Sequence, residues 1–344
     1  YLGVVGPVRT GKSTFIKRFM EQMVLPGITD EHQKNRTRDE LPQSAAGKTI
    51  MTTEPKFVPK EAARIDLGED TAVKVRLVDC VGFMTEGASG HMENEKERLV
   101  KTPWFEESIP FTMAAEIGTR KVIRDHSTIG LVITTDGSFG ELERQAYIKP
   151  EETAVRELQE IGKPFLVLLN SSRPYSEETR NLARELETKY GVCVMPVNCE
   201  QLKTGDIYQI LKQLLFEFPV TEVDFQIPKW LEILPASHWL KQQAVKAARN
   251  AMSHIRRMKD LKDSWKDEEA EAVSSMETGR MNLSDGKVMV RMLFEDGYYY
   301  QILSDFSGLS IADEYQLMQQ LKDLAAKKSE YDKIQNAVEQ VRAR

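Results

Sequence analysis

The stretch "GPVRTGKST", from Gly6 to Thr14, decides how the rest of the chain is interpreted. It fits the pattern G-x-x-x-x-G-K-[ST] of a phosphate-binding loop, with a short apolar run before it and a helical pattern after it, as such loops require. The backbone N–H groups of this kind of loop converge on phosphates, and the start of the following helix adds partial positive charge. Lys12 is expected to reach the β- and γ-phosphates and Ser13 to bind Mg²⁺. The predicted phosphate-binding residues are Gly6, Val8, Arg9, Thr10, Gly11, Lys12, Ser13 and Thr14.

A second Gly-Lys-Thr, at Gly47 to Thr49, does not form another such loop. The first glycine of the pattern would fall on Pro42, which has no N–H to offer a phosphate, and the preceding residues are polar. Small switch GTPases place their first switch in a polar connection of this kind, with a threonine that completes the Mg²⁺ shell. Thr52 and Thr53, just before a predicted strand at 56–67, are expected to act on the metal or on the attacking water. Ordinary strand threonines are the alternative.

The sequence "VDCVG", Val78 to Gly82, ends an apolar strand predicted at 73–80 and matches the D-x-x-G element of switch-type proteins. Asp79 is expected to hold the Mg²⁺ shell and Gly82 to sense the γ-phosphate. A buried strand rarely ends in a carboxylate without a reason such as a metal, although a plain turn is the alternative. Phe83 stands where many GTPases have a water-orienting glutamine. Water positioning is therefore assigned to Thr52 or Thr53.

The base-recognition element departs from the guanine pattern. Asn170-Ser171-Ser172-Arg173 occupies the place of N-K-x-D, so Arg173 replaces the carboxylate that would accept the N1–H and N2–H groups of guanine. An arginine side chain carries donors only, and an unmatched donor pair discriminates strongly against a base. ATP is therefore the expected nucleotide. Arg9, inside the loop, is either an arginine finger in cis or a solvent-facing residue.

The periodicity divides the chain near Phe218-Pro219. Before it, continuous apolar runs alternate with amphipathic patterns, which is typical of a layered α/β domain with a mostly parallel sheet. After it, a helix, an alternating strand with a turn at Asp296-Gly297, and a final helix capped near Ser310 are expected. The predicted domains are a three-layer α/β domain at 1–219 and a smaller α+β domain at 220–344. The predicted strands are 1–6, 56–67, 73–80, 129–135, 164–170, 192–197 and 287–294, and the predicted helices are 13–24, 151–161, 176–190, 205–216, 239–265 and one from 310 onward.

Composition narrows the function classes. A net charge of −6 over 344 residues argues against a nucleic-acid footprint, and no apolar stretch is long enough for a membrane helix. Three cysteines, Cys80, Cys193 and Cys199, show no metal spacing, which suits a reducing cytosol. The chain begins inside a strand and ends inside an amphipathic helix, so the natural protein is expected to be longer.

Several long strings resemble one family. "ELPQSAAGKTIMTTEPKFVP", "RLVDCVG", "TPWFEE", "AAEIGTRKVI" with "HSTIG", and "VITTDG" are similar to the stage IV sporulation protein A family of endospore-forming bacteria. The resemblance is dense up to about Val220 and weaker after it. It implies a P-loop NTPase fold related to translation-factor-class and Ras-like GTPases, with ATP and Mg²⁺ as ligands. Lys12, Asp79, Thr52 and Thr53 match the family's functional positions.

The resemblance also implies a biological role. Family members hydrolyse ATP and polymerise into the basement layer of the spore coat, on the forespore surface that faces the mother-cell cytoplasm. The implied partners are other copies of the chain, spore-coat morphogenetic proteins, and a small amphipathic forespore-membrane protein. The family's C-terminal region, which makes that membrane attachment, is absent from this sequence. A noncanonical GTPase switch and a nucleotide-binding scaffold with little turnover remain as alternatives.

Overall fold

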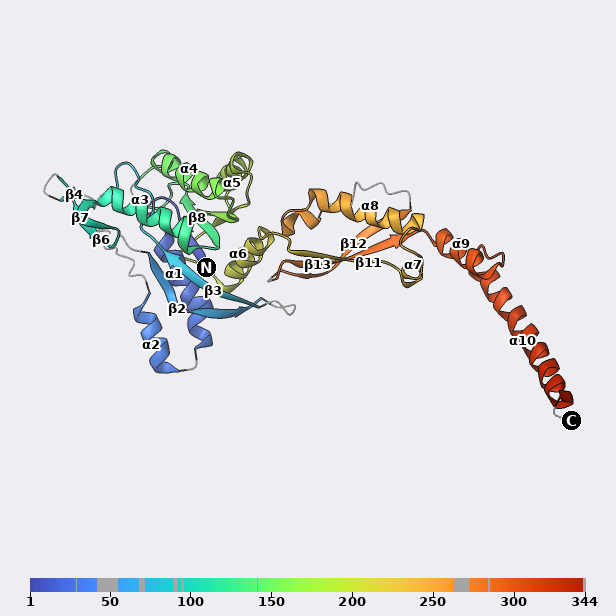
Figure 1. Ribbon diagram of the computed structural model, residues 1–344. Helices are drawn as coiled ribbons and strands as arrows, with labels where there is room; N and C mark the ends of the chain where they lie inside the picture. Colours follow the sequence, from blue (N-terminus) through green and yellow to red (C-terminus); the bar gives the residue numbers. More distant parts are fainter. Residues whose placement is uncertain are drawn as a thin grey trace. The chain divides into compact units, whose positions relative to one another are not determined.

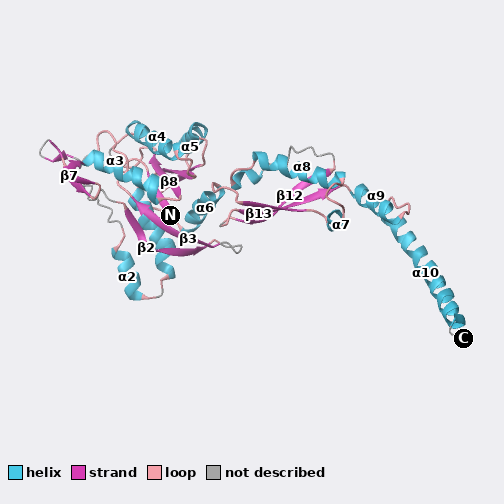
Figure 2. Cartoon of the chain, viewed as in Figure 1, coloured by secondary structure: helices cyan, strands magenta, loops and turns pink. Residues whose placement is uncertain are grey.

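The computed structural model describes residues 1–28, 30–41, 55–67, 72–88, 92–93, 96–140, 142–262, 272–283 and 285–342. The chain divides into two compact units. The first contains Tyr1–Pro219 with Arg257–Lys259 and Asn282–Asp285, and the second contains Val220–Arg256, Asp260–Met281 and Gly286–Arg344. Each unit has its own sheet and its own helices (Figures 1 and 2).

The first unit is built on a six-stranded sheet. Its order is β10-β9-β8-β1-β3-β2, and every neighbouring pair is parallel except β2 with β3. The predicted parallel-dominated α/β sheet is thereby confirmed. The strands of this unit are β1 (Leu2–Val5), β2 (Lys56–Asp66), β3 (Ala72–Asp79), β4 (Met92–Glu93), β5 (Lys96–Glu97), β6 (Leu99–Thr102), β7 (Phe105–Pro110), β8 (Ile129–Thr135), β9 (Phe165–Asn170) and β10 (Val194–Val197).

Helices cover both faces of this sheet, because its central strands are apolar on both sides. Ile129, Leu131 and Ile133 of β8 pack in the core beneath α1 and α6, whereas Val132 packs in the core beneath α4 and α5. Every residue of β8 is buried. The helices of this unit are α1 (Lys12–Phe19), α2 (Glu31–Asp39), α3 (Phe111–Lys121), α4 (Arg144–Glu160), α5 (Glu177–Tyr190) and α6 (Thr204–Phe216), with π-helical turns at Met20–Val24 and Val122–His126.

The second unit contains a three-stranded sheet of order β11-β13-β12, with β11 parallel to β13. Helix α8 buries Leu240, Ala244, Ala247 and Ala251, spaced three or four residues apart, as a helix with one core-facing side requires. The elements of this unit are β11 (Glu222–Gln226), α7 (Lys229–Glu232), α8 (Trp239–His254), β12 (Val273–Asn282), β13 (Lys287–Phe294), α9 (Asp296–Ser307) and α10 (Glu314–Arg342). Among the described residues, no helix is long and apolar enough to cross a bilayer.

Four sequence-based boundaries are wrong. Helix α4 begins at Arg144 instead of 151 and tolerates Pro150 inside it, and α8 ends at His254 because Ile255 adopts an extended conformation. Asp296-Gly297 begins helix α9 instead of forming a turn. The cap of α10 is Asp313, whose Oδ1 accepts the Gln316 N–H, and not Ser310.

The connections between α1 and β2 and between β3 and α3 contain helices and strands that the hydrophobic periodicity did not predict. Helix α2 lies in the polar segment after α1, begun by Asp30, whose Oδ1 accepts the His32 N–H. After β3, the hairpin β6–β7 leads directly into α3, and the Phe111 N–H donates to the Arg98 carbonyl. The Gly-Glu-Asp sequence at 68–70, between β2 and β3, predicts a turn, but these residues lie outside those that the structure describes.

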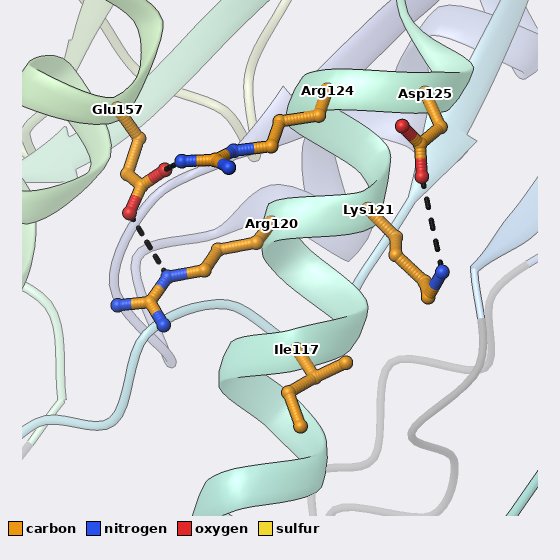
Figure 3. A pocket seen from close by; sticks show the side chains of 6 residues that line it. All are labelled: Ile117, Arg120, Lys121, Arg124, Asp125 and Glu157. Atoms are coloured by element: carbon orange, nitrogen blue, oxygen red, sulfur yellow. Dashed lines mark hydrogen bonds and ion pairs between the residues drawn. The ribbon is translucent and has the colours of Figure 1, made fainter. Parts of the chain in front are cut away.

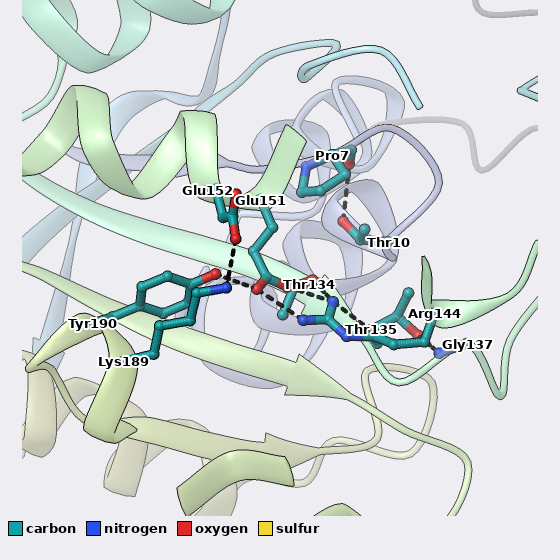
Figure 4. Close-up of polar contacts among 10 residues, drawn as sticks. All are labelled: Pro7, Thr10, Thr134, Thr135, Gly137, Arg144, Glu151, Glu152, Lys189 and Tyr190. Atoms are coloured by element: carbon teal, nitrogen blue, oxygen red, sulfur yellow. Dashed lines mark hydrogen bonds and ion pairs between the residues drawn. The ribbon is translucent and has the colours of Figure 1, made fainter. Parts of the chain in front are cut away.

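A buried ion pair fixes the start of α4 against the carboxyl end of β8 (Figure 4). Arg144 donates to both oxygens of Glu151, at 2.5 and 2.8 Å, and also to the Thr135 carbonyl at 3.2 Å. Thr134 and Tyr190 donate their hydroxyl protons to the same carboxylate, which is completely buried. A buried carboxylate needs this many donors to offset its lost hydration.

Arg144→Met is therefore expected to destabilise the first unit by about 3–5 kcal/mol, because it leaves the Glu151 carboxylate buried without its cation. The matched control is Lys189→Met, which breaks the Lys189–Glu152 pair, whose side chains are 45% and 46% exposed. That change is expected to cost about 0–1 kcal/mol. Urea denaturation followed by tryptophan fluorescence would measure both, and equal losses in the two variants would contradict the assignment.

Candidate functional site

Strand pairing brings the two predicted motifs together. Strand β1 pairs with β3 so that Val4 lies opposite Asp79, and it pairs with β8 on its other side. The chain therefore leaves β1 at Gly6 and leaves β3 at Cys80 along the same edge of the sheet. Strand order reverses at β1, and in open α/β sheets ligands bind outside the carboxyl ends of the strands at such a switch point.

The loop between β1 and α1 is joined to the D-x-x-G turn by backbone hydrogen bonds. The Phe83 N–H donates to the Gly6 carbonyl at 3.0 Å, and the Val8 N–H donates to the Phe83 carbonyl at 2.9 Å. Inside the loop, Thr10 Oγ1 and Lys12 Nζ both donate to the Pro7 carbonyl. These bonds fold the loop back over the start of α1. Ser13 and Thr14 lie in the first turn of that helix, partly buried.

Lys12 and Asp79 form the charged centre of the site. Burial lowers the pKa of Lys12, and the nearby Cys80 and Asp79 partly offset that effect. Burial raises the pKa of Asp79 to about 6, although the Lys12 ammonium opposes the change. Asp79 Oδ1 is buried, and no hydrogen-bond partner for it lies among the described residues. A carboxylate oxygen with no donor, close to a buried ammonium, is an arrangement that a cation or a bound ligand's water shell would complete.

The residues present fit a magnesium ion. Among the described residues, no cluster of three histidine, cysteine or acidic side chains could enclose a metal by itself. Mg²⁺ is ordinarily held by one or two carboxylates together with phosphate oxygens and waters instead of an all-protein cage. Within the described residues, Asp79 Oδ1 and the Ser13 hydroxyl are the two predicted metal-binding groups at the loop. Both were predicted from the sequence.

Gly82 lies directly against the phosphate loop. A Cβ atom at this position would be 2.3 Å from the Gly6 carbonyl oxygen and 2.5 Å from Lys12 Nζ. The φ angle of Gly82 is 103°, which side chains rarely tolerate. Only glycine lets the turn approach Lys12 this closely.

Arg9 stands at the outer rim of the loop. It is exposed and has a φ of 64°, the only positive φ of a non-glycine residue among those described. Burial raises the pKa of Tyr147, and the Arg9 charge acts in the opposite direction. The guanidinium therefore lies on the side of the loop near α4. The geometry is compatible with either role predicted for Arg9.

Asn170 ties the loops of the predicted base site to the phosphate loop. Its Nδ2 donates to the Thr10 carbonyl at 3.0 Å, and its Oδ1 accepts the Cys199 N–H at 3.0 Å. A Cβ at Gly11 would lie 2.6 Å from Asn170 Nδ2, so a glycine is needed there as well. Arg173 is exposed, and its backbone N–H donates to Ser171 Oγ.

The loop after β10 satisfies its own backbone. Asn198 Oδ1 accepts the N–H groups of Glu200 and Gln201, at 3.0 and 3.2 Å. Across from it, burial raises the pKa of Asp136, but hydrogen bonds from Ser138, Ser171 and Thr179 outweigh this and hold the pKa below its usual value. The backbone N–H groups of Glu200 and Gln201 are therefore already hydrogen-bonded within the protein.

The structure thus brings together the loop residues with Asp79, Gly82 and Asn170. Thr52, Thr53 and the second Gly-Lys-Thr at 47–49 lie outside the described residues. Sequence reasoning missed Asn198 and Thr119, a buried threonine of α3 whose hydroxyl accepts the Gly82 N–H. Neither belongs to a short motif, so only the fold reveals them.

Comparison with known proteins gives the class first. Residues 1–219 match the family model described as "Stage IV sporulation protein A, ATPase domain", and residues 220–344 match "Stage IV sporulation protein A, middle domain". The chain is thus a sporulation protein with an ATPase domain followed by a middle domain.

Individual relatives agree with these models. Stage IV sporulation protein A of Clostridioides difficile (strain 630) is 45% identical over 339 residues, which cover 98% of this chain and 69% of that protein. The Bacillus subtilis (strain 168) protein of the same name is 44% identical over 343 residues, covering 99% and 70%. The chain belongs to the stage IV sporulation protein A family.

The burial of Asp79 predicts an unusual pH dependence of stability. Because the pKa is about 6 in the folded protein and 3.8 in the reference state, the folded protein holds more protons between these values, and stability falls as the pH rises through them. The Tm of Asp79→Asn minus the Tm of the parent chain is therefore expected to increase by about 2–4 °C as the pH rises from 5 to 8, which corresponds to roughly 1 kcal/mol.

Differential scanning fluorimetry without nucleotide would measure this gain. The exposed Asp125→Asn is the control and should follow the parent chain at every pH. A constant offset between Asp79→Asn and the parent chain from pH 5 to pH 8 would contradict the assigned burial.

Proposed function

We propose that this chain binds and hydrolyses ATP with Mg²⁺ at the loop between β1 and α1, on a P-loop NTPase fold related to the Ras-like GTPases. The observation that carries the proposal is the buried Asp79 Oδ1, which has no hydrogen-bond partner in the part of the chain that the structure describes, beside the buried Lys12 at the sheet's switch point. The strand order, with β2 alone antiparallel at the edge, and the match to an ATPase-domain model support it.

The chain's own residues divide the work. The N–H groups at the start of α1 bind the phosphates, and Lys12 neutralises the charge that develops on the transferred group. Ser13 and Asp79 would hold Mg²⁺, which would supply charge neutralisation for the phosphates when bound. Gly82 brings its N–H to the terminal phosphate. Thr52 or Thr53 positions the attacking water, Thr53 being the proposed metal contact, and Arg9 supplies further positive charge.

Adenine is the proposed base. Arg173 offers no acceptor for guanine N1–H and N2–H. Loss of such matched pairs costs a purine much of its affinity.

Hydrolysis is proposed to drive self-assembly into the basement layer of the spore coat, on the forespore surface in the mother-cell cytoplasm. The ATPase-domain and middle-domain models and the names of the relatives support a sporulation role. Residues 220–344 are proposed to contribute subunit contacts. Coat morphogenetic proteins and a small amphipathic forespore-membrane protein are the proposed partners, reached through the family's C-terminal region.

Lys12→Ala is expected to lower the rate of ATP turnover by about 100-fold or more, because it removes the cation from the phosphate site. Lys17→Ala, on the exposed side of the same helix, is the control and should retain turnover. Phosphate release with Mg²⁺-ATP measures both. Full turnover in Lys12→Ala would contradict the site.

Thr52→Ala combined with Thr53→Ala is expected to leave nucleotide affinity within about threefold and to slow turnover strongly, because these residues act on the metal shell or the water. Fluorescent-nucleotide titration and single-turnover phosphate release separate the two effects. Normal turnover in the double variant would remove both threonines from the mechanism.

The choice of base and the link to assembly can be tested together. Phosphate release with ATP or GTP, recorded alongside light scattering on the full-length protein, is expected to show ATP-selective turnover before scattering rises. A preference for GTP would contradict the adenine assignment. Scattering without turnover would favour a nucleotide-binding scaffold.

A further inference from the structure

The N–H of Gly82 already has a partner, and that partner comes from helix α3. It donates to Thr119 Oγ1 at 3.1 Å, while the Thr119 hydroxyl proton goes to the Ala115 carbonyl at 2.8 Å. Thr119 is completely buried. A hydroxyl has one proton to give and lone pairs that accept, so both bonds are satisfied at once. In the structure, the group proposed to meet a terminal phosphate is therefore bonded elsewhere.

The helix that carries Thr119 is firmly anchored (Figure 3). Arg120 and Arg124 donate to the two oxygens of Glu157 on α4, at 2.9 and 3.0 Å. Lys163 Nζ donates to three carbonyls just beyond α3, those of Ile123, Arg124 and Ser127, each at 2.7 Å. The pocket in Figure 3, of about 430 Å³, lies between α3, the π-helical turn that follows it and Glu157 of α4, and no residue of the phosphate loop lines it. Thr119 thus sits on a fixed support.

The turn that carries Gly82 is constrained on its other side. Its Cα faces the Gly6 carbonyl and Lys12, and the Phe83 backbone pairs with both Gly6 and Val8. The turn therefore stays beside the phosphate loop. Reorienting the peptide unit that contains the Gly82 N–H is the smallest movement that would change its partner.

We propose that Thr119 is a positioning residue that competes with a terminal phosphate for the Gly82 N–H. This inference rests on the proposed function, since it requires a nucleoside triphosphate at the loop. A triphosphate must break the Thr119 bond to gain the Gly82 N–H, whereas a diphosphate lacks the group that competes for it. Removing the Thr119 hydroxyl therefore strengthens triphosphate binding selectively.

The test measures Kd values for Mg²⁺-ADP and for a nonhydrolysable Mg²⁺-ATP analogue on the 344-residue chain. Thr119→Val is expected to tighten the analogue about 2–10-fold and to leave ADP unchanged, the size of one net hydrogen bond. Thr119→Ser keeps the acceptor and should behave as the parent chain. Thr119→Ala removes the hydroxyl without a branched side chain and should repeat the selective effect if the valine variant folds poorly.

Thr188→Val is the matched control. Thr188 makes the same bond to the carbonyl four residues earlier, at 2.9 Å, but on the exposed side of α5. It should alter neither Kd. An equal change for both nucleotides in Thr119→Val, or no change for the analogue, would overturn the role of Thr119. If the parent chain binds neither nucleotide, the proposed function itself fails and the inference falls with it.

Discussion

The parallel pairing of β1 with both β3 and β8 is the constraint on which the site depends. Because Val4 lies opposite Asp79, a one-residue slip of this register would turn the buried side chains of β1 to the wrong face and separate Asp79 from the phosphate loop. The apolar cores on the two faces hold the register. The position of the charged centre is thus set by packing beneath it, not by attraction between Lys12 and Asp79.

Burial by packing also explains the shifted pKa values of Lys12 and Asp79. Burial lowers the pKa of Lys12 and raises that of Asp79, so both groups are held in conditions that disfavour their charged forms. Such destabilised groups gain most when a ligand of opposite charge arrives. The Arg144–Glu151 pair is the contrast, because hydroxyl donors and an arginine complete it within the protein. The fold supplies hydrogen-bond donors to both oxygens of Glu151, whereas Asp79 Oδ1 has no donor among the described residues.

Much of the sheet could be predicted from the sequence, because strands covered on both faces are continuous apolar runs. Predictions from short sequence patterns were wrong where the same residues are common in two kinds of local structure. Asp296-Gly297 is a frequent turn pair, yet it starts α9, and Pro150 usually ends a helix, yet α4 continues through it. Thr119 had no local signal at all, since a threonine facing the protein interior from a helix becomes informative only when its tertiary partner is known.

The two outer strands of the six-stranded sheet are poorly suited to pairing with a strand of another molecule. On β2 the pairing with β3 is interrupted between Val58 and Ala63, and this stretch includes Pro59 and the exposed Lys60 and Glu61. The other outer strand, β10, has four residues, one of them Pro196. Irregular pairing, charge and proline all discourage the docking of a foreign strand. Pairing of this six-stranded sheet with a strand of another molecule is therefore disfavoured at both of its edges.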